Sequence, residues 1–349
     1  MMAGRRGLRW VAAVLALCLL IVTIALAGRS ILSARPASDA TPTATRTPTA
    51  TIDPTATLTP SPTPSPTIAS TPTETPTSTP IPTPAATPTL MEPGAGVMEA
   101  PDMRPDVELV GRIEERAYSS SVTGADEVYR IYLPPDYDDT ARRYPVLYLL
   151  HGWPYDQSHW DNLGVDEAAD VGIRSGSYPP FIIVMPRADP DGLYIHSAGG
   201  TGSFEDQMMT DLLPSVEAAY RVSMHREGRA IGGISRGGVW SLEIGFRHPD
   251  AFAIVGAHSP ALEMNQAPEP FDPFSLLKEP EVEGLRIYLD AGDGDWALPA
   301  ARALHEALEA EGIDHEYRIH SGAHADALWT AYLEEYLAFY TESWTEVTE

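Results

Sequence analysis

Ile231-Gly-Gly-Ile-Ser-Arg-Gly-Gly238 is the stretch that decides the fold. It overlaps an apolar run, Arg229 to Ile234, that is typical of a buried strand, and it leads into a helical pattern from Gly238 to Arg247. The segment Gly233 to Gly237 has the pattern Gly-x-Ser-x-Gly. In a strand-turn-helix, this pattern exposes the serine hydroxyl at a sharp turn, and the glycines leave room for that turn. Ser235 is therefore a candidate nucleophile, and a plain glycine-rich turn is the alternative.

Outward from this turn, short apolar runs alternate with helical patterns. The expected strands are Glu127 to Leu133, Pro145 to Leu150, Phe181 to Met185, Arg229 to Ile234, Phe252 to Ala257, Leu285 to Leu289 and Glu316 to Ile319. The expected helices are Asp206 to Ala219, Gly238 to Arg247, Pro299 to Ala310 and Ala327 to Tyr340. Several of the strands are apolar almost throughout, as in parallel strands buried on both faces. The alternation predicts an α/β fold with a mostly parallel central sheet and helices on both faces.

A nucleophilic serine needs a base, and the base needs a carboxylate that orients it. Both should lie at the carboxyl ends of strands, where active sites of open α/β sheets form. For the base we prefer His324 to His320, because Ser-Gly-Ala gives its loop room to reach the serine. For the acid we prefer Asp295 to Asp293. Asp290 lies still on the strand and is expected to hold the loop.

The developing oxyanion needs two backbone N–H donors. One candidate is Arg236, at the start of the helix after the serine. The other is Trp153, which follows the strand that ends in His151-Gly152. His151 itself is interpreted as a structural hydrogen-bonding residue. The remaining histidines considered, His225, His248, His258, His305 and His315, are interpreted as surface or structural residues.

Several tryptophans lie close to these motifs, and the alternative for each is ordinary core packing. Trp153 and Trp160 are the expected substrate-binding residues, because both sit in the expected oxyanion loop. No cofactor and no metal is expected. The acids Asp290, Asp293 and Asp295 do not have the spacing of a Ca²⁺-binding loop, and the single cysteine excludes a cysteine-based site.

These motifs, in their order along the chain, resemble the esterase family of α/β-hydrolases, which includes esterase D, feruloyl and acetylxylan esterases, enterochelin esterases and the bacterial mycolyltransferases. The resemblance rests on the stretches at 144–152, 181–186, 211–221, 231–238, 248–252, 290–296 and 322–324. It implies the α/β-hydrolase fold, with Ser235 as nucleophile, His324 as general base and Asp295 as orienting acid. Asp211 stands where the family more often has Glu.

The N-terminal segment, residues 1–40, has the pattern of a targeting sequence. Arg5, Arg6 and Arg9 precede an apolar run over 10–27. Its length favours a membrane anchor, and cleavage after Ala27 would instead release a secreted protein. Either outcome predicts an extracytoplasmic location. Cys18 is interpreted as an apolar residue of this run.

Residues 41–105 are expected to form a disordered stalk, and residues 106–349 the esterase domain. Thr and Pro supply 19 and 13 of the positions 41–90, which excludes lasting helix or sheet there. Residues 91–349 carry a net charge of −29 within a whole-chain charge of −26. Such an acidic body is repelled by phosphate backbones, so no nucleic acid is expected as a partner, and membrane contact is expected only through the N-terminal segment.

The expected function is a serine-dependent carboxylic ester hydrolase that acts on a small-molecule or polysaccharide ester, of feruloyl or acetyl type. One alternative is an acyltransferase that uses the same three residues. Another is a surface binding module on an inactive hydrolase scaffold, which the complete set of Ser, acid and His argues against. Since the base must be neutral to accept a proton, activity is expected to fall in acid.

Overall fold

An eight-stranded sheet forms the centre of the computed structural model, which describes residues 97–188, 193–195 and 198–346. The strands are β1 (Arg112–Ser119), β2 (Asp126–Leu133), β3 (Val146–Leu150), β4 (Ile182–Pro186), β5 (Arg229–Ile234), β6 (Ile254–His258), β7 (Arg286–Gly292) and β8 (Glu316–His320). Their order across the sheet is β1-β2-β4-β3-β5-β6-β7-β8. The pairs β1–β2 and β2–β4 are antiparallel, and every later pair is parallel.

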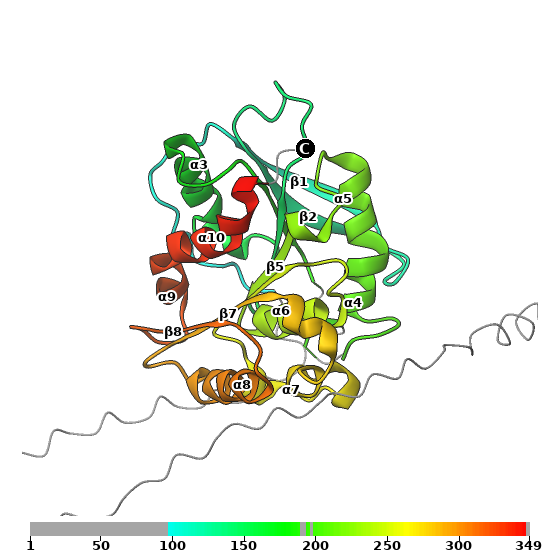
Figure 1. Cartoon of the computed structure of the whole chain (residues 1–349). Helices are drawn as coiled ribbons and strands as arrows, with labels where there is room; N and C mark the ends of the chain where they lie inside the picture. Colours follow the sequence, from blue (N-terminus) through cyan, green and yellow to red (C-terminus); the bar gives the residue numbers. More distant parts are fainter. Residues whose placement is uncertain (1–96, 189–192, 196–197, 347–349) are drawn as a thin grey trace, which may run out of the picture. The chain divides into compact units, whose positions relative to one another are not determined.

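Helices cover both faces of this sheet. The α-helices are α2 (His159–Asn162), α3 (Val165–Ser175), α4 (Phe204–Asp206), α5 (Leu213–Ala219), α6 (Arg236–Arg247), α7 (Pro273–Leu276), α8 (Leu298–Glu311), α9 (Asp326–Ala331) and α10 (Leu333–Thr341). A π-helical segment, η3 (Gln207–Leu212), joins α4 to α5, and the 3₁₀ segments are η4 (Arg226–Gly228), η5 (Leu262–Met264), η6 (Glu269–Phe271), η7 (Pro280–Gly284) and η8 (Glu342–Glu346). Figure 1 shows α3 and α10 on one side of the sheet and α5 on the other.

Side chains that alternate along the central strands build two separate cores. In β3, Val146, Tyr148 and Leu150 face the core beneath α5, α6 and α8, whereas Leu147 and Leu149 face the core beneath α3 and α10. All five residues are at most 1% exposed. Burial on both faces explains why this strand is an uninterrupted apolar run, and it confirms the predicted α/β architecture.

Three features of the fold differ from the sequence-based expectation. Strand β1 was not predicted, because its sequence RIEERAYS is polar and seven of its eight side chains are exposed or half-buried at the edge of the sheet. Helix α3 was also missed. The predicted helix over Ala327 to Tyr340 is instead two helices, α9 and α10, that are separated at Tyr332.

The predictions for residues 1–40, and for the stalk up to residue 96, lie outside the described residues. Among the residues that the structure describes, no helix has the length and the apolar character needed to cross a membrane.

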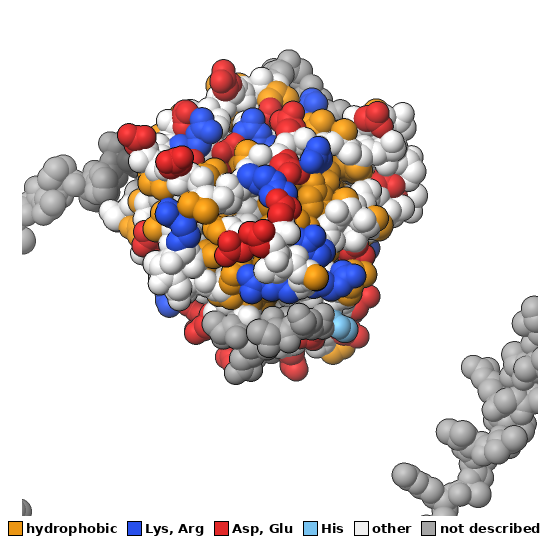
Figure 2. Space-filling view, turned by 90° about the horizontal axis from the view of Figure 1, so that it is seen from above, with side chains coloured by type: hydrophobic (Ala, Val, Ile, Leu, Met, Phe, Trp, Pro, Cys, Tyr) orange, Lys and Arg blue, Asp and Glu red, His pale blue; other side chains and the backbone are white. Residues whose placement is uncertain are grey.

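Charged side chains of both signs are interspersed over the face seen from above in Figure 2, with hydrophobic side chains between them. Strand β1 gives an example of such pairing, since Arg112 contacts both Glu114 and Asp138, and Arg116 also contacts Glu114. Exposed ion pairs of this kind contribute at most about 1 kcal/mol each to stability. The large net negative charge is therefore locally offset here.

Candidate active site

Ser235 occupies the turn between β5 and α6 in a backbone conformation that non-glycine residues rarely adopt. Its φ is 56° and its ψ is −114°. The turn is held on both sides, because the Ser235 N–H donates to the carbonyl of His258 at 2.9 Å and the Ser235 carbonyl accepts from the N–H of Ala261 at 3.0 Å. Strain of this kind persists only where the surrounding structure fixes it, and it aims the hydroxyl away from the sheet.

The two glycines of the motif are required by close backbone contacts. A Cβ on Gly233 would lie 2.2 Å from the carbonyl oxygen of Gly237. A Cβ on Gly237 would lie 2.4 Å from the carbonyl oxygen of Leu150. Neither contact can be relieved by rotating a side chain, so helix α6 can approach β3 and β5 this closely only with glycine at both positions.

His324 lies in the loop between β8 and α9 and joins Ser235 to Asp295. Its Nε2 is 2.9 Å from Ser235 Oγ, and its Nδ1 is 2.8 Å from Asp295 Oδ1. Since an ionised carboxylate only accepts, Nδ1 carries the proton and donates to Asp295. The lone pair of Nε2 is then free to accept the hydroxyl proton of Ser235.

Asp295 is buried, with 5% of its surface exposed. Burial alone would raise the pKa of its carboxyl, but the hydrogen bond and charge of His324 and the N–H of Ala297 hold that pKa below its ordinary value. The Ala297 N–H donates to Asp295 Oδ1 at 2.7 Å. The carboxylate therefore stays ionised in the range in which His324 can act as a base.

The other two acids of this loop are engaged elsewhere. Asp293 is exposed, and its Oδ1 accepts from the Gly322 N–H at 3.0 Å. Asp290 is completely buried, where it accepts from the hydroxyl of Tyr336 at 2.7 Å and lies 3.1 Å from His258 Nδ1. Neither has a hydrogen bond to His324 among the described residues, so the geometry favours Asp295.

Two tryptophans flank the imidazole of His324. The ring of Trp296 is tilted by 37° at a centroid distance of 4.3 Å, and that of Trp329 meets it edge-on at 5.1 Å. Trp329 is held in place because its Nε1–H donates to Ser259 Oγ at 3.2 Å. The sequence placed both residues near the motifs without indicating this contact.

The two expected oxyanion donors follow the carboxyl ends of two neighbouring parallel strands, β3 and β5. Trp153 belongs to the loop after β3, and Arg236 is the first residue of α6, where helix N–H groups point outward. The side chain of Arg236 is buried and is turned toward the neighbouring loops. Its Nε donates to the carbonyl of Tyr194 at 2.6 Å, and its Nη1 donates to Asn265 Oδ1 at 3.2 Å.

Trp160 is not at the site, which corrects the expectation that it binds substrate. Its side chain is 1% exposed, and its Nε1–H donates to the carbonyl of Leu150 at 2.9 Å. The residue packs in the core beneath α3 and α10. Its position after β3 suggested that Trp160 lines a pocket, but the residue belongs to the short helix α2 and its side chain points into the core.

His151 is a buried structural residue, as expected. Its Nε2 accepts from the Ala188 N–H at 3.1 Å, which requires the neutral ring. Burial lowers the pKa of His151 to about 4. The alternative base His320 is stacked on Tyr332 with ring centroids 3.7 Å apart, and its Nε2 lies 3.2 Å from the hydroxyl of Tyr288, whereas Ser235 Oγ pairs with His324.

A pair of buried acids, Glu205 and Glu243, lies beside Gly199. Glu205 accepts from Arg247 Nε at 2.7 Å and lies 2.6 Å from His248 Nε2. Burial opposes ionisation of Glu205, but these partners lower its pKa to about 2. Glu243 of α6 is fully buried, and burial together with the negative charge of Glu205 raises its pKa from 4.5 to about 8. At neutral pH, one acid of the pair is ionised and the other is protonated.

Replacing Glu243 by Gln is expected to change how stability depends on pH. In the folded state Glu243 keeps its proton up to about pH 8, whereas in the unfolded chain the carboxyl loses its proton near pH 4.5. The free energy of unfolding therefore decreases as pH rises between these two values. Gln mimics the protonated form, so the variant should gain on the order of 2 kcal/mol over the wild type between pH 5 and pH 9. Urea unfolding of both proteins at pH 5 and pH 9 measures the free energy of unfolding. An equal decrease in wild type and variant between the two pH values would contradict the prediction.

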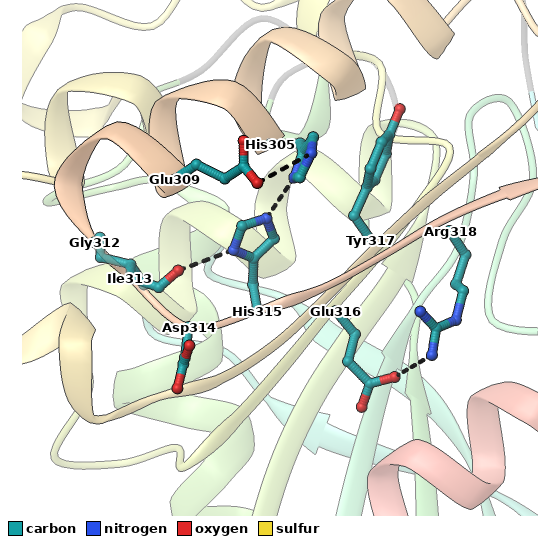
Figure 3. A pocket seen from close by; sticks show the side chains of 9 residues that line it. All are labelled: His305, Glu309, Gly312, Ile313, Asp314, His315, Glu316, Tyr317 and Arg318. Carbon is teal, nitrogen blue, oxygen red and sulfur yellow. Dashed lines mark hydrogen bonds and ion pairs between the residues drawn. The ribbon is translucent and has the colours of Figure 1, made fainter. Parts of the chain in front are cut away.

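A second cluster of titratable groups lies at the opposite end of β8 from His324. His305 and His315 line a pocket there, with His305 Nδ1 at 2.7 Å from His315 Nε2, and Figure 3 shows the carboxylate of Glu309 turned toward His305. Within the described parts of the chain, no three His, Cys, Asp or Glu side chains are arranged to hold a metal ion.

A family model described as "Putative esterase" matches residues 120–340, which is more than half of the chain. The chain belongs to this esterase family. The matched region runs from the hairpin of β1 and β2 to α10, and it includes the serine turn, the acid loop and the histidine loop. With the sheet order described above, the architecture is the α/β-hydrolase fold.

Named relatives of this esterase-family chain are also esterases. An endo-1,4-beta-xylanase/feruloyl esterase of Xylanibacter ruminicola is 30% identical over 64% of this chain and 31% of its own length. A ferri-bacillibactin esterase of Bacillus subtilis is 28% identical over 56% of this chain and 79% of its own. A solved ferulic acid esterase is 27% identical, with a TM-score of 0.61 over 68% of this chain and 100% of that chain. The chain spans about a third of the length of the first curated relatives.

Proposed function

We propose that this protein is a serine carboxylic ester hydrolase with Ser235 as nucleophile, His324 as general base and Asp295 as orienting acid. The single observation that carries the proposal is the continuous hydrogen-bonded path from Ser235 Oγ through His324 to Asp295, with distances of 2.9 and 2.8 Å. Hydrogen-bond contact between nucleophile, base and acid is the geometry that activates a serine.

The reaction follows from these positions. His324 Nε2 takes the hydroxyl proton as Ser235 Oγ attacks the ester carbonyl. The carbonyl oxygen becomes negatively charged and accepts the N–H groups of Trp153 and Arg236, while Asp295 stabilises the imidazolium. The proton on Nε2 passes to the departing alcohol, which leaves the acyl group on Ser235. Water activated by His324 then releases the acid and restores the serine.

The proposed substrates are feruloyl- or acetyl-type esters of carbohydrates. Two observations support this class. Two proteins that this chain resembles are named a feruloyl esterase and a ferulic acid esterase. The ring of Trp296 beside His324, and Trp153 in the loop after β3, supply aromatic surface for an acyl group close to the serine.

We also propose that the enzyme works outside the cytoplasm. Support comes from the sequence of residues 1–40 and from the Thr- and Pro-rich segment that follows, which together suit a catalytic domain carried on a stalk.

The test is hydrolysis of a panel of esters by the purified full-length protein. Methyl ferulate, 4-nitrophenyl acetate and 4-nitrophenyl palmitate are compared with and without an added alcohol. Turnover of the first two, with free acid as the main product, is the expected result. Ester formation with the alcohol as the main product would indicate an acyltransferase, and absence of turnover for every ester would overturn the proposal.

A further inference from the structure

His159 connects the loop that follows β3 with the loop that carries His324. Its Nδ1 accepts from the backbone N–H of Gly152 at 3.1 Å. Its Nε2 lies 2.9 Å from Oδ1 of Asp326. Gly152 directly precedes the candidate oxyanion donor Trp153, and Asp326 lies two residues after His324, at the start of α9. One side chain thus touches both halves of the proposed site.

The protons of His159 are fixed by these two partners. A backbone amide can only donate, so Nδ1 must carry a lone pair, and Nε2 must carry the proton that is donated to Asp326. The side chain of His159 is completely buried, so water cannot replace either bond. Burial also lowers the pKa of His159, which keeps the ring in the neutral form that this arrangement needs.

Neighbouring contacts hold the ring in position. Tyr155 packs against it with a centroid distance of 4.2 Å, and the Tyr155 hydroxyl lies 3.4 Å from Oδ2 of Asp326. The His159 N–H donates to the carbonyl of Asp156 at 3.0 Å. The acidic groups that face the ring are therefore Asp326 and, at longer range, Asp156.

Gly152 is the residue for which such a restraint matters most. It has no side chain, so its backbone would otherwise sample the widest range of angles in the loop. A Cβ there would lie 3.3 Å from Cε1 of His159, which leaves little space for any other residue. Rotation at Gly152 would turn the next peptide group, which bears the N–H of Trp153.

We propose that His159 is a positioning residue, which orients the Gly152–Trp153 peptide group toward the oxyanion and ties it through Asp326 to the loop of His324. The inference rests on the proposed function. It predicts that His159 acts on the transition state, in which the oxyanion exists, more than on substrate binding.

Two conservative variants separate the two bonds of His159. In His159→Asn, the amide oxygen can occupy the place of Nδ1 and accept from Gly152, but the side chain is too short to reach Asp326. In His159→Gln, the amide nitrogen can occupy the place of Nε2 and donate to Asp326, but Gly152 loses its acceptor. His159→Ala removes both bonds. Tyr155→Phe is a matched control, because it keeps the ring that packs on His159 and removes only the long 3.4 Å contact of the hydroxyl with Asp326 Oδ2.

The readouts are kcat and KM for 4-nitrophenyl acetate, the inhibition constant of a trifluoromethyl ketone that forms an oxyanion on the serine, and Tm. We expect kcat to fall about 10- to 100-fold in His159→Ala and His159→Gln, with KM changed less than about 3-fold. The inhibition constant should rise in parallel. We expect His159→Asn to retain kcat within about 5-fold, and Tyr155→Phe to match the wild type.

Two results would overturn the inference while the proposed function stands. One is an active His159→Ala with unchanged kcat and inhibition constant. The other is equal loss of kcat in the Asn and Gln variants in step with Tm, which would indicate a purely structural role. A wild-type protein without esterase activity in the same assay would instead overturn the proposed function, and this inference with it.

Discussion

Ser235→Ala is expected to lower kcat for ester hydrolysis by about 10⁴-fold or more and to leave the fold intact. The substitution removes the atom that attacks the carbonyl and the hydroxyl that donates to His324 Nε2. What remains is catalysis by the oxyanion donors and by binding, which is small compared with the full reaction. The loss should appear in kcat and in kcat/KM alike.

The measurement compares the variant with the wild type on 4-nitrophenyl acetate, together with Tm. Ser241→Ala is the matched control, because Ser241 lies on the same helix and is fully buried, with its hydroxyl donating to the carbonyls of Gly238 and Gly256. That control should lose roughly 1 kcal/mol of stability and keep its kcat. Turnover that persists in Ser235→Ala would rule out this serine as the nucleophile.

Combining this change with His324→Ala tests whether the two residues act as a unit. If His324 works only by activating Ser235, the double variant should be no slower than either single variant, within about 10-fold. If the double variant instead lost kcat by the product of the two single losses, His324 would have a role separate from activating Ser235.

The part of the site that the sequence predicted is the part encoded locally. The turn at Ser235 is specified by glycines two residues away on each side. Asp295 follows an apolar run that ends at Leu289, and His324 follows the shorter, mixed segment Glu316 to Ile319. Parallel strands bring their carboxyl ends to one edge, so the order of these segments along the chain sufficed to expect them together.

What the sequence did not predict depends on contacts between distant segments. Trp160 lies in the expected loop, but its side chain packs against β3 because of how α2 is placed on the sheet. The local sequence pattern does not predict that placement. The bond between His159 and Asp326 joins residues 167 positions apart. Strand β1 is specified mainly by its pairing with β2, because an exposed edge strand has little hydrophobic pattern of its own.

Asp295→Asn is expected to lower kcat by about 10⁴-fold, whereas Asp293→Asn should change it by less than about 10-fold. An amide at position 295 has no negative charge to stabilise the imidazolium, and where its nitrogen faces His324 Nδ1 it favours the tautomer that carries its proton on Nε2. That tautomer cannot accept the proton of Ser235. Asp293 accepts only from the Gly322 N–H among the hydrogen bonds described, and its exposed position lets water replace that bond.

The two variants form a matched pair, since each exchanges one carboxylate for an amide of the same size in the same loop. Steady-state kinetics on 4-nitrophenyl acetate would distinguish the two variants. If Asp293→Asn instead lost more kcat than Asp295→Asn, Asp293 would be the orienting acid. The pH dependence adds a second criterion. The pKa of Asp295 is lower in the folded protein than in the unfolded chain. Its carboxylate therefore stabilises the folded state at any pH above the unfolded pKa, and this contribution is lost as pH falls through the folded pKa. Asp295→Asn should therefore flatten the loss of stability in acid, because the substituted side chain has no proton to gain.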